Sequence, residues 1–155
     1  MRRVWVYALA LAAALFWEST PFSGTDVGKL LPVELVLLER SGALLQISTD
    51  TQDRGRGVTV DKSLEDLKLS APGEIFLDTA DYILIRDGME QHLLELSQYL
   101  RPACGICILR GDAELSDVAR YLAVHPPRKT LRDYCNGETK IPVLTAEQER
   151  MTLEQ

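Results

Sequence analysis

The sequence contains few of the residues that enzymes and metal sites use most often. It has three cysteines and two scattered histidines, so neither a recognisable zinc spacing nor a catalytic triad is present. Basic residues are also in deficit, because 17 lysines and arginines stand against 23 aspartates and glutamates, for a formal net charge of −6. An acidic chain without a basic, aromatic-rich stripe repels phosphate backbones. We therefore expect no cofactor and no nucleic-acid partner.

Long apolar runs are also missing. The N-terminal run from Val4 to Trp17 has 14 residues, which is shorter than the roughly 20 that usually span a bilayer. Because Arg2 and Arg3 precede it, the segment has the positive n-region and apolar h-region of a secretory signal. We interpret residues 1–18 as a signal peptide or an uncleaved signal anchor, and a buried N-terminal helix is the alternative. The protein is then expected outside the cytoplasm, either secreted or held in the membrane by Val4 to Trp17.

The rest of the chain fits one domain. With 155 residues and 46% hydrophobic content it can bury its own core. We expect a linker over residues 19–32, a single domain over 33–144 and a C-terminal tail over 145–155. At the start of the domain, two β-rich segments, Val33 to Glu39 and Ala43 to Thr49, flank Ser41-Gly42. This pattern predicts a β-hairpin.

A polar segment with two glycines follows the hairpin, over residues 50–57. Its Arg54 and Arg56 form an Arg-Gly-Arg-Gly run among Asp50, Asp53 and Asp61. Arg-Gly repeats can bind RNA, but the surrounding carboxylates favour a solvated turn. We therefore predict a loop, with the two arginines available for surface contacts.

The middle of the domain combines one helix and two extended segments. Thr59 is a good N-cap, and the apolar residues after it recur at spacings of four, three and four, which predicts a helix ended by Pro72-Gly73. Residues 74–77 and 82–85 are apolar and extended, divided by a bend that contains Asp78 and Asp81. Two carboxylates in a bend raise the alternatives of calcium binding or general-base catalysis. Aspartate is common in turns for its own hydrogen bonds, so we expect turn residues here.

The C-terminal half alternates between helices and strands. We predict a helix over Met89 to Leu100, a buried strand over Ile106 to Arg110, a helix capped by Asp112, and a short helix after Thr130. Residues 141–144 either add an edge strand or cross the surface, and the capping pattern at 145–148 predicts a short, frayed helix. The fold class is therefore α/β or α+β. It comprises a small mixed sheet with an N-terminal hairpin and a βαβ unit, and three to four helices pack on it.

Two cysteines, Cys104 and Cys107, form a CxxC motif, which suggests a thiol–disulfide oxidoreductase. Such enzymes place the first thiol at a helix N-terminus, whereas this motif leads into a predicted strand. In an extended chain, residues three apart point to opposite faces and lie too far apart for a disulfide. We therefore expect two buried thiols, with redox chemistry as the alternative. A disulfide from Cys135 to Cys104 or to Cys107 is a further alternative, which outside the cytoplasm would leave one free thiol.

The central segment resembles the N-terminal domain of the spore-germination receptor C-subunit lipoproteins of endospore-forming bacteria. The shared pattern is Gly55-x-Gly57-x-Thr59-Val60, then Ser63-Leu64-x-x-Leu67, the paired segments at 74–77 and 82–85, and the strand and helix over 106–122. Two features depart from that family: no lipobox cysteine precedes Cys104, and Ala80-Asp81 replaces a small residue followed by histidine. The resemblance implies a non-enzymatic module close to the membrane that packs against partner proteins. It transfers no catalytic residue.

These observations lead to one functional expectation and two alternatives. We expect a non-enzymatic, exported or membrane-tethered accessory module with a membrane or envelope protein as its partner, linked to sporulation or spore germination. The alternatives are a thiol–disulfide oxidoreductase that uses Cys104 and Cys107, and an envelope domain that senses a ligand.

Overall fold

The structure is a computed structural model that describes residues 30–147 and 150–155. The predicted signal segment, and with it the expected membrane contact through Val4 to Trp17, lies outside the described residues. From Leu31 to Gln155 the chain forms one compact unit. Within the described ranges, no helix is long and apolar enough to cross a membrane.

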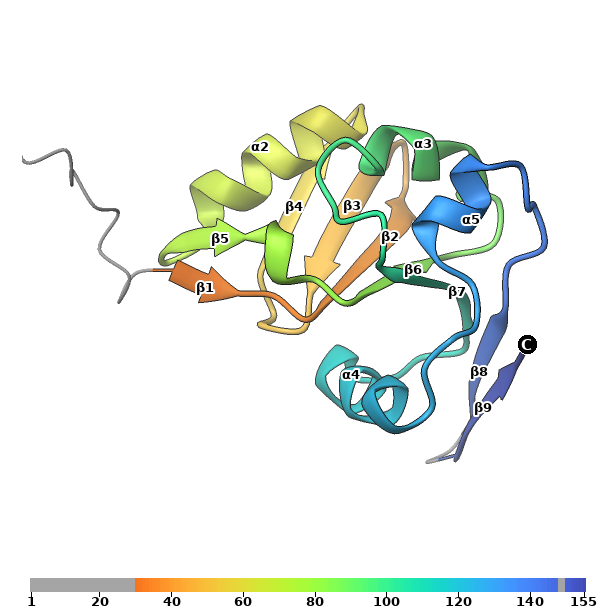
Figure 1. The fold of residues 1–155 in the computed structure, drawn as a ribbon. Helices are drawn as coiled ribbons and strands as arrows, with labels where there is room; N and C mark the ends of the chain where they lie inside the picture. Colours follow the sequence, from red (N-terminus) through yellow and green to blue (C-terminus); the bar gives the residue numbers. More distant parts are fainter. Residues whose placement is uncertain (1–29, 148–149) are drawn as a thin grey trace, which may run out of the picture. The chain divides into compact units, whose positions relative to one another are not determined.

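A seven-stranded mixed sheet is the framework of this unit (Figure 1), and its strands lie in the order β4-β3-β2-β6-β7-β8-β9. Four adjacent strands, β2, β6, β7 and β8, are parallel, and the pairs β2–β3, β3–β4 and β8–β9 are antiparallel. The predicted α/β class, with its hairpin and βαβ unit, is therefore confirmed. The strands are β2 Leu35–Ser41, β3 Leu44–Thr49, β4 Arg54–Gly57, β6 Tyr82–Ile85, β7 Gly105–Arg110, β8 Val143–Glu147 and β9 Arg150–Glu154. A separate two-stranded sheet pairs β1 (Leu30–Pro32) with β5 (Glu74–Phe76).

Helices cover both faces of the large sheet. Figure 1 shows α2 (Val60–Ser70), α3 (Leu93–Leu96) and α5 (Leu131–Cys135) on one face and α4 (Leu115–Val124) on the other. Successive side chains of a strand point to opposite faces of the sheet, so the apolar residues of one strand contribute to two separate cores. On β2, for example, Val36 and Leu38 join the α2-side core, whereas Leu35 and Leu37 join the α4-side core.

The helix after the hairpin forms as predicted. Thr59 is its N-cap, and the Thr59 side chain accepts a hydrogen bond from the N–H of Lys62. The predicted apolar residues Val60, Leu64 and Leu67 are buried in the α2-side core. This helix was predictable because its N-cap and its apolar spacing lie within one short segment.

The prediction of a loop over the whole of residues 50–57 is wrong, because residues 54–57 form β4, antiparallel to β3. The two glycines explain the difference. A Cβ atom on Gly55 would lie 2.2 Å from the carbonyl oxygen of Ser63, and one on Gly57 would lie 2.5 Å from the Ser63 nitrogen. The strand therefore packs directly against the backbone of α2, which only glycine permits.

The segments at 74–77 and 82–85 belong to different sheets. β5 pairs with β1, β6 lies between β2 and β7, and a 3-10 turn over Leu77–Thr79 divides them. In this turn the Thr79 Oγ1 accepts from the backbone N–H of Val33 at 3.0 Å. The helix predicted over Met89 to Leu100 is shorter than expected. It consists of a 3-10 turn over Glu90–His92 and α3, although Met89, Leu93, Leu96 and Leu100 are all buried as the spacing predicts.

Two further helices follow β7. α5 begins after Thr130 as predicted, and Thr130 and Asp133 form a capping box at its N-terminus. Asp112 does not cap α4, whose N-cap position is Glu114. The Asp112 carboxylate forms an ion pair with Arg86 at 3.1 Å. Val118, Ala119 and Leu122 of α4 are buried in the α4-side core, and Leu115 packs against it.

The prediction of a C-terminal helix in residues 145–155 is wrong. This segment contributes most of β8 and all of β9, which form an antiparallel pair at the end of the large sheet. Leu144 and Ala146 are buried in the α4-side core, and Met151 and Leu153 pack on it. Pairing with β7 and burial of these alternating side chains override the local capping signal.

Candidate functional site

The two edge strands of the large sheet, β4 and β9, differ in whether their outward backbone groups have hydrogen-bond partners. At the β4 edge, the backbone N–H of Arg56 donates to the Asp66 carboxylate at 2.8 Å. On the same edge, the Ser70 hydroxyl donates to the carbonyl oxygen of Arg54 at 3.0 Å. Both partners belong to α2, so this helix occupies two of the backbone groups with which a foreign strand would otherwise pair.

The direction of the backbone groups on β8 follows from one hydrogen bond. The N–H of Ile108 on β7 donates to the carbonyl oxygen of Pro142 at 2.8 Å. β7 and β8 are parallel, with Ile108 beside Val143. In a parallel pair, a residue that donates to one position accepts from the amide two residues later. Pro142 and Leu144 therefore point their backbone groups toward β7, and Thr145 points its groups toward β9.

The open groups of β9 are those of Met151 and Leu153. Thr145 lies beside Thr152 in the antiparallel register, so the backbone groups of Thr152 point to β8 and those of its two neighbours point outward. β9 is the last strand of the sheet, and within residues 30–147 and 150–155 no strand pairs with its outer side. Unlike β4, β9 thus offers two residues with outward N–H and C=O groups to an incoming strand.

The side chains of β9 divide between two surfaces. Met151 and Leu153 are half-buried on the α4-side core. The opposite surface of β8 and β9 carries no large apolar side chain in its hollow of about 890 Å³, which is lined by Thr145, Glu147, Arg150, Thr152 and Glu154. A strand added at this edge would therefore meet an apolar stripe on one face and alternating charges on the other. We define the outer side of residues 150–154, with these two surfaces, as the β9 edge.

The cysteines predicted as a buried pair lie on opposite faces of the sheet. Cys104 belongs to the α2-side core, and Cys107 belongs to the α4-side core. The Cys104 thiol donates to the carbonyl oxygen of Ala80 at 2.9 Å. Burial raises the pKa of Cys104 and raises the pKa of Cys107 to about 12. Thiol–disulfide exchange depends on a lowered thiol pKa, so this geometry supplies the opposite of what that chemistry uses.

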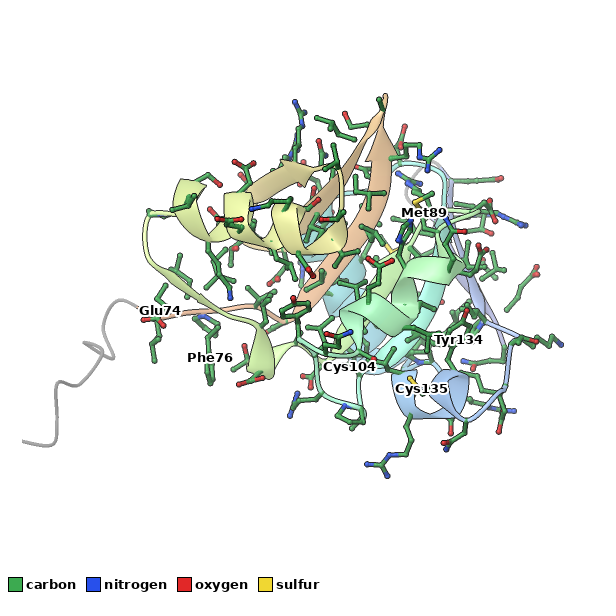
Figure 2. The ribbon with its side chains drawn as sticks, turned by 90° about the horizontal axis from the view of Figure 1, so that it is seen from above. Glu74, Phe76, Met89, Cys104, Tyr134 and Cys135 are labelled. Atoms are coloured by element: carbon green, nitrogen blue, oxygen red, sulfur yellow. The ribbon has the colours of Figure 1, made fainter. Side chains whose placement is uncertain are left out.

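The third cysteine, Cys135, is exposed on α5 (Figure 2), and all three thiols are free. The predicted turn carboxylates have different surroundings. Asp81 forms an ion pair with Arg101 at 2.6 Å, and Asp78 is exposed on the 3-10 turn. Across the part of the chain that the structure describes, no three His, Cys, Asp or Glu side chains come together as a metal site.

Arg56 belongs to a row of polar side chains that crosses the α4 side of the sheet. Its Nε donates to Gln46 Oε1 at 2.7 Å, and Gln46 Nε2 donates to Glu39 Oε1 at 2.8 Å. Glu39 Oε2 in turn lies 3.6 Å from Arg86 Nε. Arg56, Gln46 and Glu39 are direct cross-strand neighbours in the register of β4, β3 and β2. We call these four residues the polar row.

A cleft of about 480 Å³ lies between the polar row and the start of α4. Its charged lining includes Glu39, Asp50, Arg54, Arg86, Asp112 and Glu114. The Arg86 guanidinium also donates to the carbonyl oxygens of Leu109 and Gly111. Sequence reasoning named Arg54 and Arg56 but missed Arg86, whose signal was a charged residue directly after a buried strand. Arg54 faces this cleft and Arg56 joins the row, whereas Asp78 and Asp81 lie elsewhere.

Comparisons of the chain with protein-family models, with curated proteins and with solved structures found no match. Two features stand out among those described, namely the β9 edge and the charged cleft beside the polar row.

Proposed function

We propose that this chain is a non-enzymatic interaction module of the cell envelope, and that it binds a protein partner by strand addition at the β9 edge. The observation that carries the proposal is the contrast between the two sheet edges. α2 closes the β4 edge through Asp66 and Ser70, whereas Met151 and Leu153 keep outward backbone groups. Exposed strand edges bind extended segments through main-chain hydrogen bonds, and side chains on the two faces supply specificity.

The envelope location is supported by the sequence. Arg2 and Arg3 followed by the apolar run to Trp17 form the pattern of an export signal. The similarity in pattern to germination-receptor C-subunits supports a link to sporulation or spore germination, with a membrane protein as partner. Cell fractionation with N-terminal sequencing tests the location. Recovery of the protein in the cytosol with Met1 intact would overturn this part of the proposal.

The binding surface can be tested by photo-crosslinking in cells. A photoreactive amino acid at Thr152 should give a protein adduct, because this position lies at the centre of the β9 edge. The matched control is the same amino acid at Leu69, which is 80% exposed on α2, at the opposite edge of the sheet. Adducts from neither position, or from both equally, would contradict binding at β9.

Ligand sensing is a second candidate function, favoured by the cleft of about 480 Å³ beside the polar row. Its lining carries both signs of charge, which suits a small polar ligand that itself carries both. Thermal-shift measurements with free amino acids as probes test this function. Arg54→Gln should reduce any shift, whereas Arg40→Gln, which alters an exposed arginine on β2, should not. The absence of any shift with the unmodified protein would count against ligand sensing.

A further inference from the structure

We propose that the partner at the β9 edge is a second copy of this chain, whose own β9 pairs antiparallel about a two-fold axis at Thr152. This inference rests on the function proposed above, because it names the occupant of the same edge. It is argued from the sequence of β9 and from the direction of its backbone groups.

The charge pattern of β9 is complementary to itself. The strand reads Arg150, Met151, Thr152, Leu153 and Glu154. Antiparallel pairing centred on Thr152 places Arg150 of one copy opposite Glu154 of the other, at both ends of the strand. Opposite charges directly across an antiparallel pair stabilise it, and like charges destabilise it. An isologous two-fold contact requires this self-complementarity, and the strand has it.

The same register places the apolar side chains together. Met151 of one copy lies opposite Leu153 of the other, on the face where both pack on the α4-side core. The two α4-side cores would then join across the axis. The polar surface also becomes continuous, because both copies present Arg150, Thr152 and Glu154 on the other face.

The backbone groups agree with this register. The outward N–H and C=O groups belong to Met151 and Leu153, as derived above from the pairing of β8. In the proposed dimer these two residues are opposite one another, so each pair exchanges both backbone hydrogen bonds. Thr152 then faces its symmetry mate in the closely spaced, non-hydrogen-bonded position.

Competing arrangements are less favourable. Parallel pairing in register would place Arg150 beside Arg150 and Glu154 beside Glu154, which sets like charges against each other. A slip of one residue in the antiparallel arrangement would set Thr152 opposite Met151 and mix the polar and apolar faces. The contact covers one five-residue edge, so we expect a reversible dimer that forms at micromolar or higher concentration.

A disulfide probe tests the two-fold axis directly. Thr152→Cys is introduced into a Cys135→Ser background of the full chain, because Cys135 is the exposed native thiol. Non-hydrogen-bonded antiparallel pairs have Cα atoms about 4.5 Å apart, within the range that a disulfide bridges. Mild oxidation should therefore give a covalent dimer. Thr145→Cys, on the same face but one strand inward, is the matched control and should stay monomeric.

Charge reversal tests the register. Sedimentation velocity of the Arg150→Glu variant should show a dimer weakened about tenfold, because two attractive pairs become repulsive. The double variant Arg150→Glu/Glu154→Arg restores opposite charges in the dimer and should recover most of the affinity. Equal melting temperatures of the three proteins would show that the monomer fold is intact. Failure of the double variant to recover dimer formation would contradict this register.

The remaining outcomes separate the two proposals. A monomer at all concentrations, together with a Thr152 photo-adduct to a different protein in cells, overturns self-pairing and leaves strand addition at β9 standing. A monomer with no Thr152 adduct overturns both proposals. A covalent Thr152→Cys dimer without a Thr145→Cys dimer supports both.

Discussion

Asp66, in the second turn of α2, accepts a hydrogen bond of 2.8 Å from the backbone N–H of Arg56 on the edge strand β4. A helix that already packs on the sheet thus also blocks the edge of that sheet. Natural proteins protect edge strands in this way because open edges pair with other chains. Among the described residues, no helix or strand bonds the outer backbone groups of β9 in this way, so the two edges of one sheet differ.

Replacing Asp66 by alanine should reopen the β4 edge. We expect the free energy of unfolding to fall by about 1 kcal/mol, because the N–H of Arg56 loses its partner. Static light scattering should also show more self-association than in the unmodified protein. Asp66→Asn is the matched control, since its amide oxygen can still accept the hydrogen bond. If Asp66→Ala matched the unmodified protein in both measurements, the Asp66 side chain would have no role in closing this edge.

Gly55 should not tolerate a side chain. A Cβ atom there would lie 2.2 Å from the Ser63 carbonyl oxygen and 2.3 Å from the Leu67 nitrogen, both rigid backbone atoms. Gly55→Ala should therefore lower the free energy of unfolding by about 3 kcal/mol in urea titrations, at the upper end of overpacking costs. Gly42→Asn is the control, because Gly42 has φ +64 with open space around it and asparagine adopts that conformation readily. A small effect at Gly55 would mean that α2 can move away from β4.

Gly55 and Gly57 show why β4 could not be predicted from the sequence. A helix such as α2 was predictable because its determinants, the Thr59 cap and the apolar spacing from Val60 to Leu67, lie within one short segment. The strand character of Gly55 depends instead on the approach of α2 residues that come later in the chain. Glycine also removes the alternating side chains by which a strand is recognised.

The C-terminal strands and the polar row were missed for a related reason. At Thr145 the local capping pattern favoured a helix, but pairing with β7 and burial of Leu144 decide the structure. The polar row requires Glu39, Gln46 and Arg56 to be neighbours across three strands, and this follows only from the register.

Arg86 should be needed for stability in a way that lysine cannot replace. Its guanidinium reaches Asp112 at 3.1 Å, Glu39 at 3.6 Å and the carbonyl oxygens of Leu109 and Gly111. We expect Arg86→Ala to cost about 2 kcal/mol in urea titrations, because these partners lose their donor. Arg86→Lys should recover less than half, since one ammonium group cannot span them all. Exposed Arg40→Ala serves as the control, and a similar loss there would argue against a specific role of Arg86.

The buried thiol of Cys107 should make stability depend on alkaline pH. Burial raises its pKa to about 12, whereas an unfolded chain has a thiol pKa of about 8.5. Between these values the unfolded state has lost a proton that the folded state keeps. The contribution is therefore complete below about pH 8.5 and declines as pH rises toward about 12. For Cys107 alone, the free energy of unfolding should fall by about 2 kcal/mol between pH 8 and pH 10.

Urea titrations across this pH range can isolate that contribution. Cys107→Ala should lose a constant amount of stability from its small cavity but show a shallower decline with pH. Cys104 will keep part of the decline, because burial also raises its pKa. Cys135→Ala is the matched control, because it removes an exposed thiol and leaves both buried thiols in place. Equal slopes in Cys107→Ala and the unmodified protein would mean that the Cys107 thiol ionises in the folded state as it does in the unfolded chain. The thiol would then be reactive in the folded protein.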